Sequence, residues 1–142
     1  MANSTRKNSM HAQVEWQQGM QFKATSGSGH AVTMDGDKTN GASPMEMVLM
    51  AAGSCSSVDV VSILEKAKQS FERCEVAIEG KRADSVPAVF TDIHMHFIVY
   101  GTEVAPKHVE RAVKLSAEKY CSVSIMLGAS VNITHSFEIV AV

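Results

Sequence analysis

The chain has 142 residues, of which 45% are hydrophobic and 20% charged, and its formal net charge is −2. This composition is ordinary for a globular protein that buries a core, and it excludes disordered and collagen-like chains. Lys and Arg are scattered along the sequence, which argues against a nucleic acid or an anionic membrane as partner. We expect a flexible N-terminal segment at residues 1–11 and a single domain at residues 12–142.

The sequence carries no strong targeting signal. Arg6 and Lys7 are not followed by an apolar stretch, so we expect no secretory signal. The longest run without a charged residue, 47–58, is shorter than a membrane span. These features predict a soluble, cytoplasmic protein.

The first third of the chain alternates between apolar and polar residues. Val14 and Trp16 share one face, which is the period-two pattern of a half-buried strand. Turn residues at Gln18 and Gly19 lead into a second strand through Phe22, and a Ser/Gly turn leads into a third strand through Val32. We expect three strands, followed by a polar loop.

A strong helix start follows this loop. Ser43 can cap the helix, Pro44 fits its first position, and Glu46 completes a capping box. The helix is predicted to run to about Lys68. Its first half, from position 45 to 55, is apolar or small on nearly every side, so we expect this half to be buried all round.

The rest of the chain predicts two strands, two helices and a last strand. The helix opened by Pro106 is expected to end near Tyr120, and a short helix beyond Cys121 is stopped by Gly128. The order of elements predicts an α+β domain with mostly antiparallel pairing. The predicted inward residues of the strands are Cys74, Val76, Ile78, Ile93, Met95, Phe97, Val99, Val131, Ile133, Phe137 and Ile139. The predicted buried stripe of the helix that Pro106 opens is Val109, Ala112, Val113, Ser116 and Tyr120.

Three cysteines, without a CxxC pair, exclude a secreted disulfide framework, a zinc ribbon and a thioredoxin motif. Cys55 lies among small residues, so it is either a small buried hydrophobe or a reactive thiol with room around its sulfur, and Asp59 would raise its pKa. Cys121 precedes a helix at Ser122, where the dipole favours a thiolate, although a buried junction residue is the alternative. Cys74 lies on an inward strand face and is interpreted as structural.

The histidines suggest a metal site only weakly. His94 and His96 share one strand face, where two imidazoles could meet one ion, but no further ligand stands at a supporting distance in sequence. We interpret them as part of a solvated polar face and predict no metal or cofactor. His135 falls on an apolar face and is interpreted as a hydrogen-bonded core residue.

Three stretches resemble the OsmC/Ohr family of osmotically inducible and organic-hydroperoxide-resistance proteins, most closely its small YhfA-like branch. They are SPMEMVLMAAGSCSSVDVV (43–61), LSAEKYCSVSIML (115–127) and VNITHSFEIV (131–140). The resemblance implies an OsmC-like α+β fold in which antiparallel sheets wrap around a long central helix. It also implies an intertwined homodimer with its sites at the interface.

The resemblance further implies that Cys55 attacks an organic hydroperoxide and that Cys121 then closes a disulfide. A dithiol or a lipoylated protein would reduce this disulfide. Two positions depart from the family pattern, because Met45 stands where the family has a glutamate and Met20 where it has an arginine. The sequence therefore leaves two hypotheses: a thiol-dependent hydroperoxide reductase, or a non-catalytic module of the same fold that holds a small apolar ligand.

Overall fold

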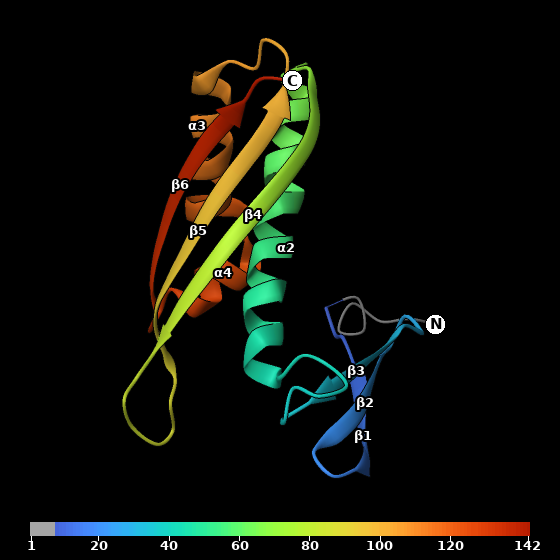
Figure 1. Ribbon diagram of the computed structural model, residues 1–142. Helices are drawn as coiled ribbons and strands as arrows, with labels where there is room; N and C mark the ends of the chain where they lie inside the picture. The colour runs from blue at the N-terminus through green and yellow to red at the C-terminus, as the bar shows by residue number, and fades with distance from the viewer. Residues whose placement is uncertain (1–7) are drawn as a thin grey trace. The chain divides into compact units, whose positions relative to one another are not determined.

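The computed structural model describes residues 8–142, which form two compact units (Figure 1). One unit ends at Met47 and the other covers Val48–Val142. Positions 1–7 of the predicted flexible segment lie outside the described residues, and positions 8–11 are exposed. The expectation of a single domain over residues 12–142 stays a prediction.

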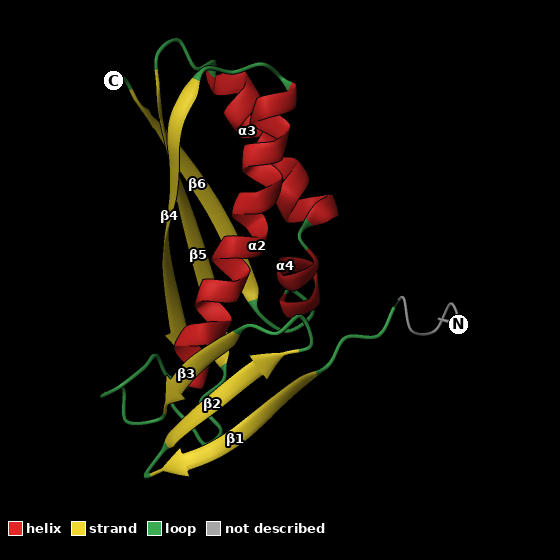
Figure 2. Cartoon of the chain, turned by 90° about the vertical axis from the view of Figure 1, so that its right-hand side faces the viewer, coloured by secondary structure: helices red, strands yellow, loops and turns green. Residues whose placement is uncertain are grey.

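The first unit holds a three-stranded antiparallel sheet in the order β1-β2-β3 (Figure 2). These strands are β1 (Ala12–Gln18), β2 (Gln21–Ser26) and β3 (Ala31–Asp35). The three predicted strands are confirmed, and the predicted turn carries Gly19 at a φ of +53°, a conformation that glycine adopts at little cost. The half-buried pattern of β1 is wrong. Every residue of β1 is exposed, Trp16 by 63%, because no other segment of the first unit covers a face of this strand.

The capping box predicted for α2 (Pro44–Lys66) is confirmed. The backbone N–H of Ser43 donates to Glu46 Oε1 at 2.9 Å, and the backbone N–H of Glu46 donates to Ser43 Oγ at 3.2 Å. These two bonds satisfy donors that a helix N-terminus otherwise leaves free. The helix ends two residues before the predicted Lys68, a residue whose φ of +56° does not continue a right-handed helix.

The prediction that the first half of α2 is buried all round is wrong. Within positions 45–55, Ala52 and Gly53 are buried, whereas Met50 is 48% exposed. Gly53 faces side chains of the second unit's sheet, and Ser56 is hydrogen-bonded to the segment that holds Ser116 and Cys121, whereas the side that carries Val58 is left 66% exposed. The buried residues of α2 are Ala52, Gly53, Ser56, Val60 and Leu64.

α2 is long and apolar enough to cross a membrane by length and composition. Its second-unit part packs on a sheet of its own chain. Gly53 lets the helix approach closely, because a Cβ at this position would collide with Ile78 Cδ1 and lie 3.2 Å from Val76 Cγ1.

The second unit is a three-stranded sheet in the order β4-β5-β6 with helices on one face (Figures 1 and 2). Its elements are β4 (Phe71–Arg82), β5 (Phe90–Gly101), α3 (Pro106–Leu115), the π-helix η1 (Ser116–Tyr120), α4 (Ser122–Leu127) and β6 (Asn132–Val140). Antiparallel pairing is confirmed for β4 with β5 and in the first sheet. β5 and β6 pair in parallel, because the helices between them form a crossover that returns the chain to the same end of the sheet.

The inner face of β5 forms the centre of the core, as its alternation predicts. Ile93, Met95, Phe97 and Val99 are almost fully buried, together with Val60 and Leu64 of α2. Of the predicted stripe on the next helix, Tyr120 is wrong, because it is 50% exposed. The backbone N–H of Cys121 donates to Ser116 O at 2.9 Å, and the wider π-turn this bond closes rotates Tyr120 away from the buried side.

Candidate thiol site

The second unit brings Cys55 and Cys121 together. Cys55 lies near the middle of α2, and Cys121 is the residue that caps the N-terminus of α4. The Cys55 and Cys121 thiols are hydrogen-bonded to each other. Cys55 is half-buried, whereas Cys121 is 0% exposed, so among the described residues Cys55 is the member of the pair that solvent reaches.

Two serines direct further hydrogen bonds toward the Cys121 sulfur. Ser56 Oγ donates to Cys121 Sγ at 3.2 Å, and the backbone N–H of Ser124 donates to the same sulfur at 3.3 Å. The hydroxyls of Ser56 and Ser124 also lie 3.2 Å apart. Because all these groups are buried, their hydrogen bonds have little competition from water, and they fix the position of the sulfur.

A third buried serine connects this cluster to a charge. Ser116 Oγ lies within hydrogen-bonding distance of Ser56 O at 3.2 Å and of Asp59 Oδ2 at 3.0 Å. Ser116 begins the π-helix, so the turn that leads into Cys121 is tied to α2 at two points. The local geometry of the thiol pair therefore depends on α2, η1 and α4 together.

The two thiols differ in acidity. Burial alone raises the pKa of Cys121, but the hydrogen bonds from Ser124, Ser56 and Cys55 outweigh it and hold that pKa below its ordinary value. For Cys55, the backbone N–H of Val123 lowers the pKa, but burial, the hydrogen bond to Cys121 and the negative charges of Cys121 and Asp59 raise it above the ordinary value. As predicted, the backbone N–H at the start of α4 lowers the pKa of Cys121, and Asp59 raises the pKa of Cys55. The two thiols titrate as one coupled pair, in which the hydrogen bonds from Ser56 and Ser124 favour a negative charge on Cys121.

Cys74 lies apart from this cluster. It is half-buried on β4, and burial raises its pKa above the ordinary value, with Glu75 adding to the effect. A thiol with a raised pKa and no described hydrogen-bond donor behaves as a small apolar side chain. The structural interpretation of Cys74 is supported.

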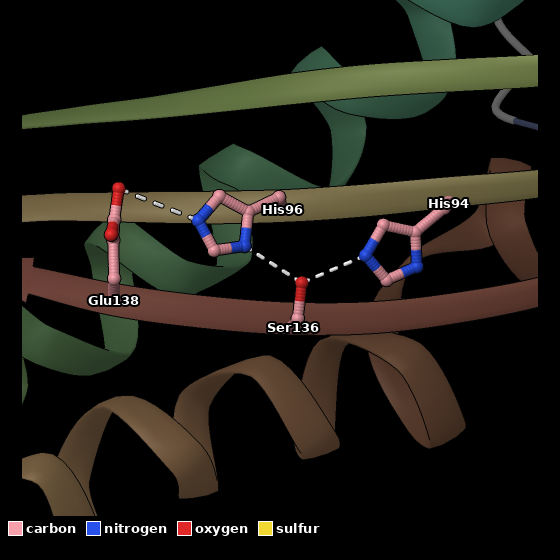
Figure 3. A network of polar contacts seen from close by, with 4 residues as sticks. All are labelled: His94, His96, Ser136 and Glu138. Atoms are coloured by element: carbon pink, nitrogen blue, oxygen red, sulfur yellow. Dashed lines mark hydrogen bonds and ion pairs between the residues drawn. The ribbon is translucent and has the colours of Figure 1, made fainter.

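His94 and His96 form a surface hydrogen-bond chain on the outer face of the second sheet (Figure 3). His94 Nε2 and His96 Nδ1 each lie 2.7 Å from Ser136 Oγ, and His96 Nε2 lies 3.5 Å from Glu138 Oε1. Within residues 8–142, no group of three His, Cys, Asp or Glu side chains is arranged to hold a metal ion. The structure supports the interpretation of a solvated polar face.

His135 differs from its predicted role as a hydrogen-bonded core residue. Its ring stacks on Phe97 with centroids 6.4 Å apart, and its Nε2 is buried without a hydrogen-bond partner among the described residues. Burial, and the neighbouring charge of His94, lower the pKa of His135. The cause is the inward register of β6, which places the ring against the apolar inner face of β5.

Comparison with known proteins decides the family. A family model for OsmC-like protein matches residues 35–136. This chain belongs to the OsmC-like family.

Relatives of this OsmC-like chain cover nearly its whole length. Protein YhfA from Escherichia coli (strain K12) is 54% identical over 133 residues, which are 93% of this chain and 99% of that protein. The crystal structure of a hypothetical protein from Aquifex aeolicus has a TM-score of 0.86 at 33% identity, covering 94% of this chain and 98% of its own. The organic hydroperoxide resistance protein OhrB of Bacillus subtilis has a TM-score of 0.61 at 12% identity, covering 92% and 98%. At this level of identity, the similarity to OhrB shows a shared fold alone.

The two positions that depart from the family pattern lie in the first unit. Met20 is exposed in the turn between β1 and β2, and Met45 lies in the first turn of α2. The neighbouring Glu46 is engaged in the capping box, where the backbone N–H and hydroxyl of Ser43 lower its pKa. The family has an arginine at the position of Met20, and the cation nearest to this position in the sequence is Lys23. Lys23 is exposed on β2. Glu46 therefore serves the helix start, as the sequence suggested.

Sequence reasoning missed the part played by three serines, Ser56, Ser116 and Ser124. Each is buried, and each is hydrogen-bonded within the thiol cluster. In the sequence, Ser56 appears as a small residue that leaves room around Cys55, and Ser116 appears as a member of a buried helix stripe. One signal was available: Ser116 interrupts an apolar stripe, and a buried hydroxyl needs a partner.

Proposed function

We propose that this OsmC-like protein reduces organic hydroperoxides with the Cys55/Cys121 pair. The observation that carries the proposal is the direct hydrogen bond between the two thiols, with Cys55 half-buried and Cys121 fully buried behind it. A peroxide that enters from solvent meets Cys55 first. The name of the Bacillus subtilis structural neighbour, an organic hydroperoxide resistance protein, supports the substrate class.

In the proposed reaction, the Cys55 sulfur attacks one peroxide oxygen and becomes a sulfenic acid, and the alcohol leaves. The Cys121 sulfur then attacks the Cys55 sulfur, and a disulfide and water form. The peroxide gains two electrons and the two thiols together lose two. A small dithiol or a lipoylated protein returns these electrons and restores both thiols.

We propose that the active form is a cytoplasmic homodimer, with no nucleic acid or membrane as partner. α2 and β1 expose large apolar side chains that a soluble chain rarely leaves uncovered, among them Trp16, Met50 and Val58. A second copy of the chain would cover them, as in the intertwined dimer that the family resemblance implies. Its arrival would also supply the missing layer on α2.

The test is a single turnover with mass mapping. The fully reduced protein receives one equivalent of cumene hydroperoxide, the thiols are alkylated at timed intervals, and peptides are identified by mass. A disulfide between Cys55 and Cys121, with Cys74 alkylated, is the expected result, and Cys55→Ser is expected to leave the peroxide intact. Three alkylated thiols with unreacted peroxide would contradict the proposal and favour the non-catalytic binding module.

A further inference from the structure

We propose that Cys121 acts before the disulfide step, as the base that takes the Cys55 proton and the acid that returns it to the leaving alcohol. This inference rests on the proposed function. Its ground is the arrangement of donors, because the Ser56 hydroxyl, the Ser124 backbone N–H and the Cys55 thiol all point at the Cys121 sulfur. Three donors around one sulfur are the environment of a thiolate.

Burial separates the roles of the two sulfurs. Cys121 is 0% exposed, so it cannot meet a peroxide first, whereas Cys55 can. The hydrogen bond with Cys121 raises the pKa of Cys55 and so favours its undissociated thiol, which is a poor nucleophile. Cys55 therefore needs a base in contact with its own proton, and the Cys121 sulfur is the acceptor that the structure places there.

Within residues 8–142, Cys121 is the one side chain that is hydrogen-bonded to Cys55. The Asp59 carboxylate on α2 reaches Cys55 only through its field, and its Oδ2 is engaged by Ser116 Oγ at 3.0 Å. The backbone N–H of Val123 donates to the Cys55 sulfur, so it stabilises the thiolate once the proton has moved. The two sulfurs thus share one proton inside a fixed set of donors.

The step balances as follows. Cys55–SH passes its proton to Cys121–S⁻ while the Cys55 sulfur bonds to the terminal oxygen of the hydroperoxide and the O–O bond breaks. The alkoxide that leaves takes the proton back from Cys121 and becomes the alcohol. Cys121–S⁻ then attacks the sulfenic acid on Cys55, and the disulfide forms as hydroxide leaves. The two sulfurs give two electrons to the peroxide, and a dithiol from outside is needed only for the next turnover.

The experiment measures peroxide loss in a single turnover, because this rate reports the first step whether or not a disulfide follows. Reduced wild type and Cys121→Ser receive one equivalent of cumene hydroperoxide at a series of pH values. General acid–base catalysis is worth roughly 10²- to 10⁴-fold, so Cys121→Ser is expected to be at least about 100-fold slower near neutral pH. The difference should shrink as the pH rises past about 8.5–9, where a free thiol ionises without help.

Ser56→Ala keeps both thiols and removes one donor from Cys121. It is expected to slow peroxide loss near neutral pH by about tenfold and to move the midpoint of the pH profile upward. Ser62→Ala on the same helix and Cys74→Ser are the matched controls, and both should keep the wild-type rate. If Cys121→Ser does not fold by circular dichroism, Ser56→Ala decides alone.

A wild-type rate in Cys121→Ser near neutral pH, with sulfenic acid accumulating on Cys55, would overturn the inference and leave Cys121 as the resolving thiol only. A wild-type rate and pH profile in Ser56→Ala would overturn it as well. Failure of the proposed function looks different, because the wild-type protein itself would then leave the peroxide intact.

Discussion

Replacement of His135 tests how much a buried, unpaired polar atom lowers the stability of this fold. Its Nε2 is buried without a partner, and its ring stacks on Phe97 in the core of the second unit. Replacement by leucine removes the unpaired nitrogen and keeps a side chain of similar size. We expect His135→Leu to be more stable than the wild type.

The expected gain follows from two opposing effects. A buried polar atom without a hydrogen bond costs about 1–3 kcal/mol, and His135→Leu removes that cost. Loss of the ring contact with Phe97 costs about 0.5–1.5 kcal/mol. The net expectation is a stabilisation of about 1 kcal/mol, which corresponds to roughly 2–4 °C in Tm for a chain of this size.

Urea denaturation at one fixed protein concentration measures this gain, at about pH 8 and again at about pH 5.5. Burial lowers the pKa of His135 in the folded state below the unfolded value of about 6.5, so the unfolded state binds the proton first. Stability from the neutral ring is therefore fully present above about pH 6.5 and is lost as the pH falls through the folded pKa. His135→Leu does not titrate, so its advantage should widen at the lower pH.

His135→Gln is the matched control. It keeps a polar side chain but cannot titrate, so we expect no gain at about pH 8 and a smaller loss than the wild type on acidification. The reasoning would be refuted if His135→Leu were no more stable than the wild type at the higher pH. That result would mean that water satisfies Nε2 in solution.

Three further predictions concern α2. Ser43→Ala removes the hydroxyl that accepts from the Glu46 backbone N–H, and so breaks the reciprocal capping box. The free energy of unfolding, measured by urea denaturation, should fall by about 0.5–2 kcal/mol. Gly53→Val should lower the Tm, because overpacking against Ile78 costs about 1–3 kcal/mol, and an unchanged Tm would show that the sheet yields freely. Val58→Asp should shift the protein toward monomer in sedimentation velocity if a second copy covers α2, whereas an unchanged sedimentation coefficient would place the interface elsewhere.

Most elements of this fold can be predicted from the sequence because their signals are local. Ser43, Pro44 and Glu46 mark the start of α2 within four positions, and their bonds form as expected. The strict alternation of β5 identifies its inner face, since successive strand residues point to opposite sides. Cys121 before a helix indicates a thiol of lowered pKa, and the family resemblance indicates Cys55 as its partner.

Tertiary structure decided what depends on residues far apart in the chain. Periodicity shows that α2 has apolar sides but not which side a sheet covers, so Val58 stays exposed while Ser56 is buried. The parallel register of β6 and the π-turn before Cys121 follow from the helical crossover, which no short window of sequence specifies. Only this packing turns Ser56 and Ser124 from small residues into donors to one sulfur. The physical reason is that a hydroxyl has no fixed role until folding removes water and leaves it only the partners that are packed around it.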